Sequence, residues 1–271
     1  MCSIITLMTD FGISDPYVGV MKGVILGINP KANIVDITHL IEPQNIVQAG
    51  WAVADIYSYF PKGTIHVVVV DPGVGTGRRI IALKTADRIF LTPDNGILTL
   101  LFDIIDNYHV YEITNAHYFL EKISHTFHGR DIFAPVAAHL SAGIRLEEMG
   151  KKVSRQGLVR FALQKPSVDE QFTLRGTIIS IDHFGNLITN IDKTLFDITY
   201  SEDTRSQLKF RIKEHIIEGV SLNYMGVEVN QPLVLFGSNG LLEISIHSGN
   251  ASRYFQVRTG EPVLIELPFR E

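Results

Sequence analysis

The first 165 residues alternate short apolar runs with segments of helical periodicity, and this alternation limits the possible folds more than any other feature. Strand-like runs and the amphipathic segments between them occupy residues 3–8, 15–30, 33–38, 45–59 and 65–71. Strands joined through helices pair in parallel, by right-handed crossovers. We therefore expect an α/β domain over residues 1–165, with a mainly parallel, Rossmann-like sheet.

The remaining elements of this domain follow a less regular pattern. Residues 79–85 and 88–94 are apolar runs on either side of a short polar break, which predicts a hairpin. A further helix is expected over residues 130–142, with Pro135 either kinking it or marking its first turn. Gly143 is a natural end for that helix.

The pattern changes near Phe172. From there on, short strand-like runs are separated by Gly, Asn and Ser, without a strong amphipathic helix. Closely spaced strands of this kind are typical of antiparallel barrels and sandwiches. We expect an all-β, barrel-like domain over residues 172–271, and we place a linker over residues 151–171, which include Pro166.

Composition narrows the classes of partner. The formal charge of -5 gives no electrostatic reason to expect nucleic acid, and no stretch of 18 apolar residues predicts a membrane span. The single cysteine, Cys2, excludes an intramolecular disulfide or a thiolate metal cluster. The first residues lack the cationic region of a signal peptide. We therefore expect a cytoplasmic protein that acts on a small molecule.

Three carboxylates stand where strands are expected to end: Asp10, Asp71 and Asp94. Ligands of open α/β sheets bind outside the carboxyl ends of the strands. A single aspartate at such a place is more often a helix cap or a turn residue. Three in one half of the chain favour a polar cleft.

The turn after the third strand is rich in glycine, with Gly73, Gly75 and Gly77 before Arg78. A dinucleotide fingerprint would need its third glycine where Arg78 stands, and no P-loop lysine follows. A carboxylate at the mouth of a phosphate cradle would also repel the anion. We expect instead that the turn folds Arg78 back onto Asp71, which keeps the carboxylate charged and oriented.

A second candidate lies in residues 125–131, where His128 precedes an expected helix and follows Phe127. A lone histidine is more often structural than catalytic. The pair His125 and His128 has metal-ligand spacing, but no second His or Cys pair completes a site, so we expect no metal. An Asp, an Arg and a His without a Ser or Cys nucleophile favour the handling of a water molecule.

The β domain offers polar and aromatic residues in turns, which are either simple hairpin turns or a ligand surface. Aromatic rings stack on purines, and amide groups read the purine edge. The candidates are Asp182, Phe184, Asn186, Ser238, Glu243 and Asn250.

Six motifs follow one another along the chain, at residues 9–23, 71–79, 93–99, 126–135, 181–186 and 238–244. Together they resemble the S-adenosylmethionine hydroxide adenosyltransferases, also called S-adenosylmethionine hydrolases, which are relatives of the fluorinases and chlorinases. The resemblance covers nearly the whole chain. It implies hydrolysis of S-adenosyl-L-methionine to adenosine and L-methionine by attack of water on C5' of the ribose, without a cofactor. It also implies a homotrimer with sites at the subunit interfaces.

The resemblance assigns roles to individual residues. Asp71, Arg78 and His128 fall on the family's catalytic set, and Asp10 falls on its ribose-binding carboxylate. The other positions that it implies for substrate binding are Asp15, in the loop that helps to enclose the substrate, Phe127, Asp182 and Asn186 for the methionine portion with Phe184 between them, Ser238, Asn250 and Ala251 in the loops that grip adenine and neighbouring atoms, Tyr224 as a stacking ring, and Glu243.

Departures within the family favour the hydrolytic branch. Halogenating relatives carry non-acidic residues where this chain has Asp71 and His128, and the fluorinase has an inserted loop that is absent here. A carboxylate next to the nucleophile disfavours a halide but can orient or deprotonate water.

Three alternatives stay open at the level of sequence. A metal-dependent phosphohydrolase would use Asp10, Asp71, Asp94 and His128 as ligands. A non-catalytic sensor of S-adenosylmethionine or adenosine would use the same pocket for binding alone. Halide-dependent formation of a 5'-halo-adenosine is a minor third option.

Overall fold

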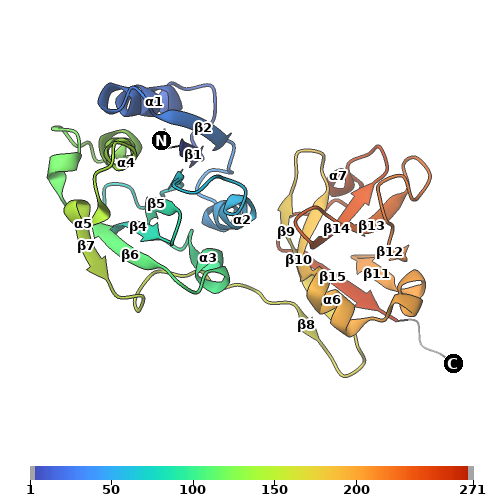
Figure 1. The fold of residues 1–271 in the computed structure, drawn as a ribbon. Coiled ribbons are helices and arrows are strands. Elements are labelled where there is room, and N and C mark those ends of the chain that lie inside the picture. The colour runs from blue at the N-terminus through green and yellow to red at the C-terminus, as the bar shows by residue number, and fades with distance from the viewer. Residues whose placement is uncertain (1–3, 268–271) are drawn as a thin grey trace. The chain divides into compact units, whose positions relative to one another are not determined.

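The computed structural model describes residues 4–267, so Cys2 lies outside the described residues. The chain divides into two compact units, Met1–Ala162 and Leu163–Glu271 (Figure 1). Within the described part, none of the helices has both the length and the apolar character that crossing a membrane requires.

The first unit is built on a sheet of seven strands in the order β2-β1-β3-β5-β4-β6-β7. The strands are β1 (Ile4–Thr9), β2 (Asn33–Thr38), β3 (Ile65–Val69), β4 (Ile80–Lys84), β5 (Ile89–Pro93), β6 (His109–Ile113) and β7 (Gly150–Val153). The pairs among β2, β1, β3 and β5 are parallel, whereas those among β5, β4, β6 and β7 are antiparallel.

The sheet is therefore mixed, and the expected parallel arrangement holds for one half of it. The other half reverses because β4 and β5 form the predicted hairpin, which leaves no room for a crossover helix between them. The Rossmann-like character of the sheet stays a prediction.

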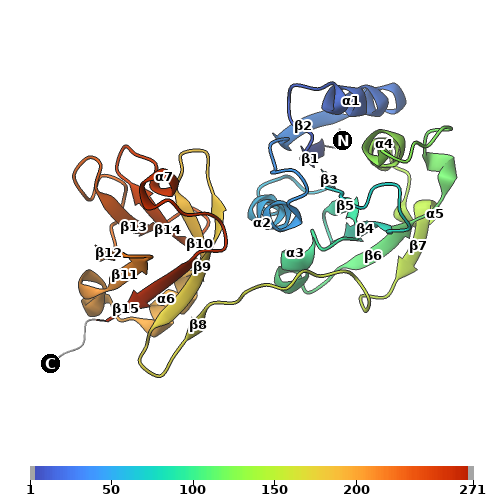
Figure 2. The ribbon, with the colours of Figure 1, turned by 180° about the vertical axis from the view of Figure 1, so that it is seen from behind.

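Helices cover both faces of this sheet (Figures 1 and 2). One face packs on α1 (Tyr17–Ile28) and α4 (Ala134–Ser141), and the other packs on α2 (Ile46–Ile56) and α3 (Thr99–Ile104). Residues of β3 alternate between the two cores, because successive side chains of a strand point to opposite faces. This two-sided burial explains the unbroken apolar run before Asp71.

The segment that carries His128 leads into the fourth helix. A π-helical turn, η2 (Gly129–Phe133), comes first and continues directly into α4, so Pro135 lies in the first turn of α4. Gly143 has a positive φ of 101° just past the helix end. Shorter elements of this unit are η1 (Ala116–Tyr118) and α5 (Leu146–Met149).

The expected linker is partly built into the first unit. β7 pairs with β6. Downstream of it, the backbone N–H of Val159 donates to Asp94 Oδ1 at 3.0 Å, and that of Phe161 donates to Thr99 Oγ1 at 3.1 Å. Only the residues beyond these anchors are left to connect the two units.

The second unit contains an antiparallel sheet in the order β12-β11-β15-β9-β10-β14-β13, with β8 paired to β9. The strands are β8 (Ser167–Val168), β9 (Leu174–Ile181), β10 (Leu187–Asp192), β11 (Lys209–Ile212), β12 (His215–Glu218), β13 (Pro232–Phe236), β14 (Leu241–Ile246) and β15 (Pro262–Glu266). The end strands β12 and β13 contact each other, so the sheet nearly closes around one apolar core. The predicted barrel-like β domain is confirmed.

Three short helical segments lie in the connections of this unit, where the sequence predicted none. They are α6 (Lys193–Thr199), η3 (Glu202–Gln207) and α7 (Ala251–Phe255). Both α6 and α7 begin at a side-chain cap, because Asp192 accepts from the N–H of Leu195 and Asn250 accepts from that of Arg253.

Candidate active site

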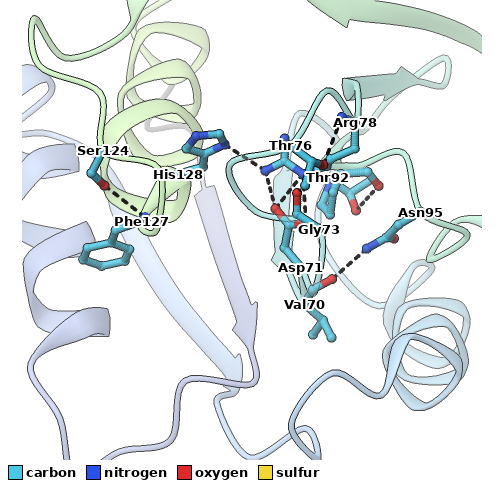
Figure 3. A network of polar contacts seen from close by, with 11 residues as sticks. Val70, Asp71, Gly73, Thr76, Arg78, Thr92, Asn95, Ser124, Phe127 and His128 are labelled. Atoms are coloured by element: carbon cyan, nitrogen blue, oxygen red, sulfur yellow. Dashed lines mark hydrogen bonds and ion pairs between the residues drawn. The ribbon is translucent and has the colours of Figure 1, made fainter.

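The glycine-rich turn after β3 folds back on itself, as predicted from its sequence. Arg78 Nε donates to both carboxylate oxygens of Asp71 at 2.8 Å, and Arg78 Nη2 also donates to Asp71 Oδ2. The side chains are 10% and 4% exposed, respectively. The start of the turn is fixed by Asn95, whose amide donates to the carbonyl of Val70 at 2.8 Å. A charged, oriented carboxylate thus lies at the end of β3 (Figure 3).

The tip of this turn lies against the loop that carries His128. Gly75 has a φ of 78°, and a Cβ at this position would lie 2.2 Å from the carbonyl oxygen of His125. Within the turn, the hydroxyl of Thr76 donates to the carbonyl of Gly73 at 2.7 Å. Only glycine meets both the backbone conformation and the close approach at position 75.

His128 completes the network from the other side of Arg78. Arg78 Nη2 lies 2.9 Å from His128 Nδ1, and Figure 3 shows the guanidinium between the imidazole and Asp71. A guanidinium nitrogen can only donate, so Nδ1 accepts and the ring proton is assigned to Nε2. Arg78 therefore holds a carboxylate and a neutral imidazole at the same time.

Electrostatics agree with a neutral ring. Burial lowers the pKa of His128, and the adjacent Arg78 guanidinium lowers it further. The carboxylates of Asp71 and Asp131 act in the opposite direction, while His125 adds to the lowering. The resulting pKa lies below the ordinary value of 6.5, so the imidazole is mostly uncharged at neutral pH.

Asp10 lies at the same edge of the sheet as Asp71. Thr9 pairs with Val69 across β1 and β3, so the residues that follow these strands are neighbours. Asp10 Oδ2 accepts from the backbone N–H of Gln44 at 2.8 Å. The ends of two parallel strands thus bring two of the predicted carboxylates together.

Phe127 belongs to an aromatic cluster of the first unit with Phe11 and Tyr17, whose ring centroids lie 5.1 to 5.9 Å apart. Asp15 is exposed, just before α1. The aromatic cluster comes from the loop after β1, the start of α1 and the loop before His128. It packs these three segments against one another.

Asp94 has a different environment from Asp71. Its carboxylate is bonded to Arg79, whose Nε lies at 2.9 Å, and to the backbone N–H of Val159 at 3.0 Å. These contacts tie β5 to the segment after β7, which is a structural task. Among residues 4–267, moreover, no group of three His, Cys, Asp or Glu side chains is placed to hold a metal ion.

In the second unit, Asp182 and Asn186 form the hairpin turn between β9 and β10. The Asn186 backbone N–H donates to Asp182 Oδ1 at 2.8 Å, and its side-chain amide donates to Asp182 Oδ2 at 2.9 Å. Phe184, at the tip, is 72% exposed. The turn is thus self-bonded and presents an aromatic ring to its surroundings.

A second loop packs directly on this turn. A Cβ on Gly185 would lie 2.1 Å from the side-chain amide nitrogen of Asn250, and the N–H of Ser252 donates to the Gly185 carbonyl at 2.9 Å. Asn250 and Ala251, at the start of α7, therefore lie beside the 182–186 turn. Two of the predicted polar loops form one continuous surface.

Glu243 is a buried carboxylate of β14. Its Oε1 accepts from the hydroxyls of Tyr224 at 2.7 Å and Ser245 at 2.8 Å. Desolvation, followed by the bond to Glu243, raises the pKa of Tyr224 to about 12, so Tyr224 stays a donor. Ser238 lies next to Gly237, where an added Cβ would approach Glu243 Oε2 to 3.0 Å.

Near His128, Asp131 and Ser124 form a contact that no sequence pattern indicated. Asp131 is fully buried and accepts from the N–H of Ser124 at 2.8 Å. The signal available was the charged pair Arg130-Asp131 inside an otherwise apolar segment. No local pattern indicates whether that pair faces solvent or the core.

Comparison with known proteins agrees with these features. The chain is 36% identical over 264 residues to the (R)-S-adenosyl-L-methionine hydrolase of Methanocaldococcus jannaschii, covering 94% of this chain and 92% of that protein. It is 31% identical to a fluorinase of Nocardia brasiliensis, covering 97% of each. An uncharacterized conserved protein from Thermotoga maritima has a similar structure, with a TM-score of 0.89 and 38% identity over 98% of this chain and 100% of that one.

Two domain families match in chain order. The N-terminal domain of the SAM hydroxide adenosyltransferases matches residues 5–150, which contain Asp71, Arg78 and His128. Their C-terminal domain matches residues 176–264, which contain the 182–186 turn and Glu243. The chain belongs to the SAM hydroxide adenosyltransferase family.

Proposed function

We propose that this protein hydrolyses S-adenosyl-L-methionine to adenosine and L-methionine by attack of water on C5' of the ribose. The observation that carries the proposal is the shared guanidinium of Arg78, which bonds Asp71 and His128 at one edge of the sheet. Hydrolases named for the (R) form of this substrate share 32 to 39% of their residues with the chain. We therefore assign the (R) form as substrate.

The chemistry suits a site without a metal ion. The leaving group departs from a sulfonium as a neutral thioether, so attack by a hydroxide-like oxygen cancels two opposite charges. A site that excludes water favours such a step, because little charge has to be solvated in the transition state. The protein must supply an oriented water and somewhere for its proton to go.

Within the network, Asp71 is the proton acceptor that we assign. A carboxylate has about four acceptor positions, and Arg78 makes three contacts with it, which leaves capacity for a water. His128 uses Nδ1 to accept from Arg78, so its Nε2–H is a donor. We assign this donor to the oxygen of the attacking water. Arg78 stabilises the anion that develops there.

Substrate-binding roles follow from the family positions. Asp10 binds the ribose hydroxyls, and Asp15 and Phe127 help to enclose the substrate. Asp182, Phe184 and Asn186 hold the methionine portion, which requires Asp182 and Asn186 to open their mutual bonds to the ligand. The residues that we assign around the adenine are Ser238, Asn250, Ala251, Tyr224 and Glu243.

We also propose a homotrimer with each site at a subunit interface. Large apolar side chains near the assigned binding residues support it, because exposed apolar patches mark interaction surfaces. Leu222 is fully exposed and Met225 is 80% exposed next to Tyr224, while Ile13 is 77% exposed near Asp15. Light scattering after gel filtration measures the mass of the assembly. A cytoplasmic location stays a prediction.

The test is product analysis with each sulfonium epimer, in the presence and absence of a chelator. Adenosine and methionine in equal amounts, formed faster from the (R) epimer and unaffected by chelation, are the expected result. Loss of activity on chelation would favour the metal-dependent alternative, and binding without turnover would favour a sensor. Release of adenine or methylthioadenosine contradicts the proposed reaction. Chloride or fluoride should not yield a 5'-halo-adenosine.

A further inference from the structure

The carboxylate of Asp131 is buried three residues after His128. Asp131 has no exposed surface, and it sits in the π-helical turn that follows His128. A buried carboxylate is costly unless it is paired and hydrogen-bonded. Arg130 Nε donates to Asp131 Oδ1 at 2.6 Å, and Arg130 Nη2 donates to Oδ2 at 3.1 Å. The cost is thus offset locally by the preceding residue.

The carboxylate also reaches back along the chain. Asp131 Oδ2 accepts from the backbone N–H of Ser124 at 2.8 Å. Ser124 Oγ in turn accepts from the backbone N–H of Phe127 at 3.0 Å, and the N–H of Asp131 donates to the Phe127 carbonyl at 3.1 Å. Residues 124–131 therefore close on themselves, with the backbone of His128 inside the closed segment.

A third contact fixes the ring beside His128. The guanidinium of Arg130 lies over the Phe127 ring, 5.2 Å from its centroid. Asp131 thus bonds the backbone before His128 directly, and it orients the guanidinium that packs on the Phe127 ring. π-Helical turns are rare and often occur at functional sites.

We propose that Asp131 is a positioning residue, which holds the closed 124–131 segment so that His128 meets Arg78. This inference rests on the proposed function, because it gives Asp131 a task in that reaction. Asp131 acts on His128 through this segment, by its bonds to Ser124 and Phe127.

The charge of Asp131 acts on the pKa of His128, and a purely structural residue would have no such effect. The charged or titratable groups that act on His128 are Arg78, Asp71, Asp131 and His125. Asp131→Asn removes a negative charge that raises the pKa of His128, so that pKa must fall further. If the neutral ring is the active form, the acid limb of the rate profile then moves to lower pH.

The matched control is Asp94→Asn. Asp94 is also buried, is bonded to the guanidinium of Arg79 and accepts from a backbone N–H, but it does not act on His128. Both variants should lower the melting temperature. Asp131→Asn alone should lower kcat, by about tenfold to a hundredfold for a misplaced catalytic group, with little change in KM. It alone should shift the titration of His128, measured by NMR without substrate.

A milder variant, Ser124→Ala, loosens the same segment without changing its charge. It should lower kcat several-fold and leave the His128 titration in place. If Asp131→Asn does not fold, an unchanged kcat in Ser124→Ala overturns the inference. If it folds, unchanged kcat and an unchanged titration overturn it. Failure of the unmodified protein to release adenosine would reject the proposed function, whereas the NMR titration would still test Asp131.

Discussion

Two aspartate–arginine pairs stand side by side in the first unit and differ in the third group that each arginine contacts. Asp71 follows β3 and is held by Arg78, while Asp94 follows β5 and is held by Arg79. Both carboxylates are nearly inaccessible, at 4% and 3% exposure of the side chain. In both pairs the arginine Nε donates to the carboxylate, at 2.8 Å in the first and 2.9 Å in the second.

The third partner separates them. Arg78 extends its guanidinium to His128, a titratable group, whereas Arg79 extends to the carbonyl of Gly157, a fixed backbone group. The second carboxylate oxygen of Asp94 accepts from the backbone N–H of Val159. A buried ion pair is thus no indication of catalysis by itself, and we assign catalysis to the pair whose arginine also contacts a titratable group.

The largest contrast is expected from removing each negative charge. Asp71→Asn should lower kcat by about a hundredfold to ten-thousandfold, the usual contribution of a positioned base, with ligand binding retained. Asp94→Asn should keep most of the activity and lose about 1–3 kcal/mol of unfolding free energy. Steady-state kinetics and denaturant unfolding measure the two effects. Near-normal turnover of a well-folded Asp71→Asn protein would eliminate its assigned role.

Replacing each arginine by lysine should give the next largest contrast. Lysine keeps the charge but lacks the planar fork, so Arg78→Lys cannot hold Asp71 and His128 together. We expect a loss in kcat of about tenfold to a hundredfold for Arg78→Lys. Arg79→Lys should mainly reduce stability, by about 1 kcal/mol. Equal losses of kcat in both variants would argue against a special role for the shared guanidinium.

Two glycines of the same turn provide a smaller test. Gly75→Ala meets a positive φ and the His125 carbonyl, whereas Gly77→Ala meets no atom within 4 Å. The first should shift the turn that carries Arg78 and lower kcat about tenfold, since small misplacements of catalytic groups are costly. The second should be close to neutral. A fully active Gly75→Ala protein would show that the turn tolerates displacement.

The smallest effect expected is on the pH profile. Protonated His128 would turn a second donor toward Arg78 and break their contact, so we expect the neutral ring to be the active form. Burial and Arg78 lower the pKa of His128 below 6.5. The rate should therefore be level around neutral pH and should fall only as the pH passes through this lowered pKa. A midpoint above 6.5 in kcat against pH would contradict the neutral, accepting imidazole.

The fold was predictable to the extent that local patterns decide it. The two-sided burial of β3 and the hairpin of β4 and β5 follow from apolar runs and one polar break. The mixed character of the sheet does not follow from such local patterns, because the direction of β6 and β7 depends on pairings with residues far away in the chain. The short helices α6 and α7 were too brief to leave a periodic signal.

The contacts of the candidate site also divide into local ones, which the sequence indicates, and long-range ones, which it does not. Arg78 lies seven residues after Asp71, so the turn alone predicted their pairing. The contact of Arg78 with His128 spans 50 residues, and only the family resemblance indicated it. Asp94 follows a strand as Asp71 does, but its partner Val159 lies 65 residues away, and no local pattern indicates that contact.

In the proposed reaction, the Asp71–Arg78 pair and His128 direct a water to C5' of the substrate. This step is tested by hydrolysis of S-adenosylmethionine in oxygen-18 water, with mass spectrometry of both products. We expect one labelled oxygen at the 5' position of adenosine and none in methionine. Adenosine that carries no label, or a label in methionine, would contradict it.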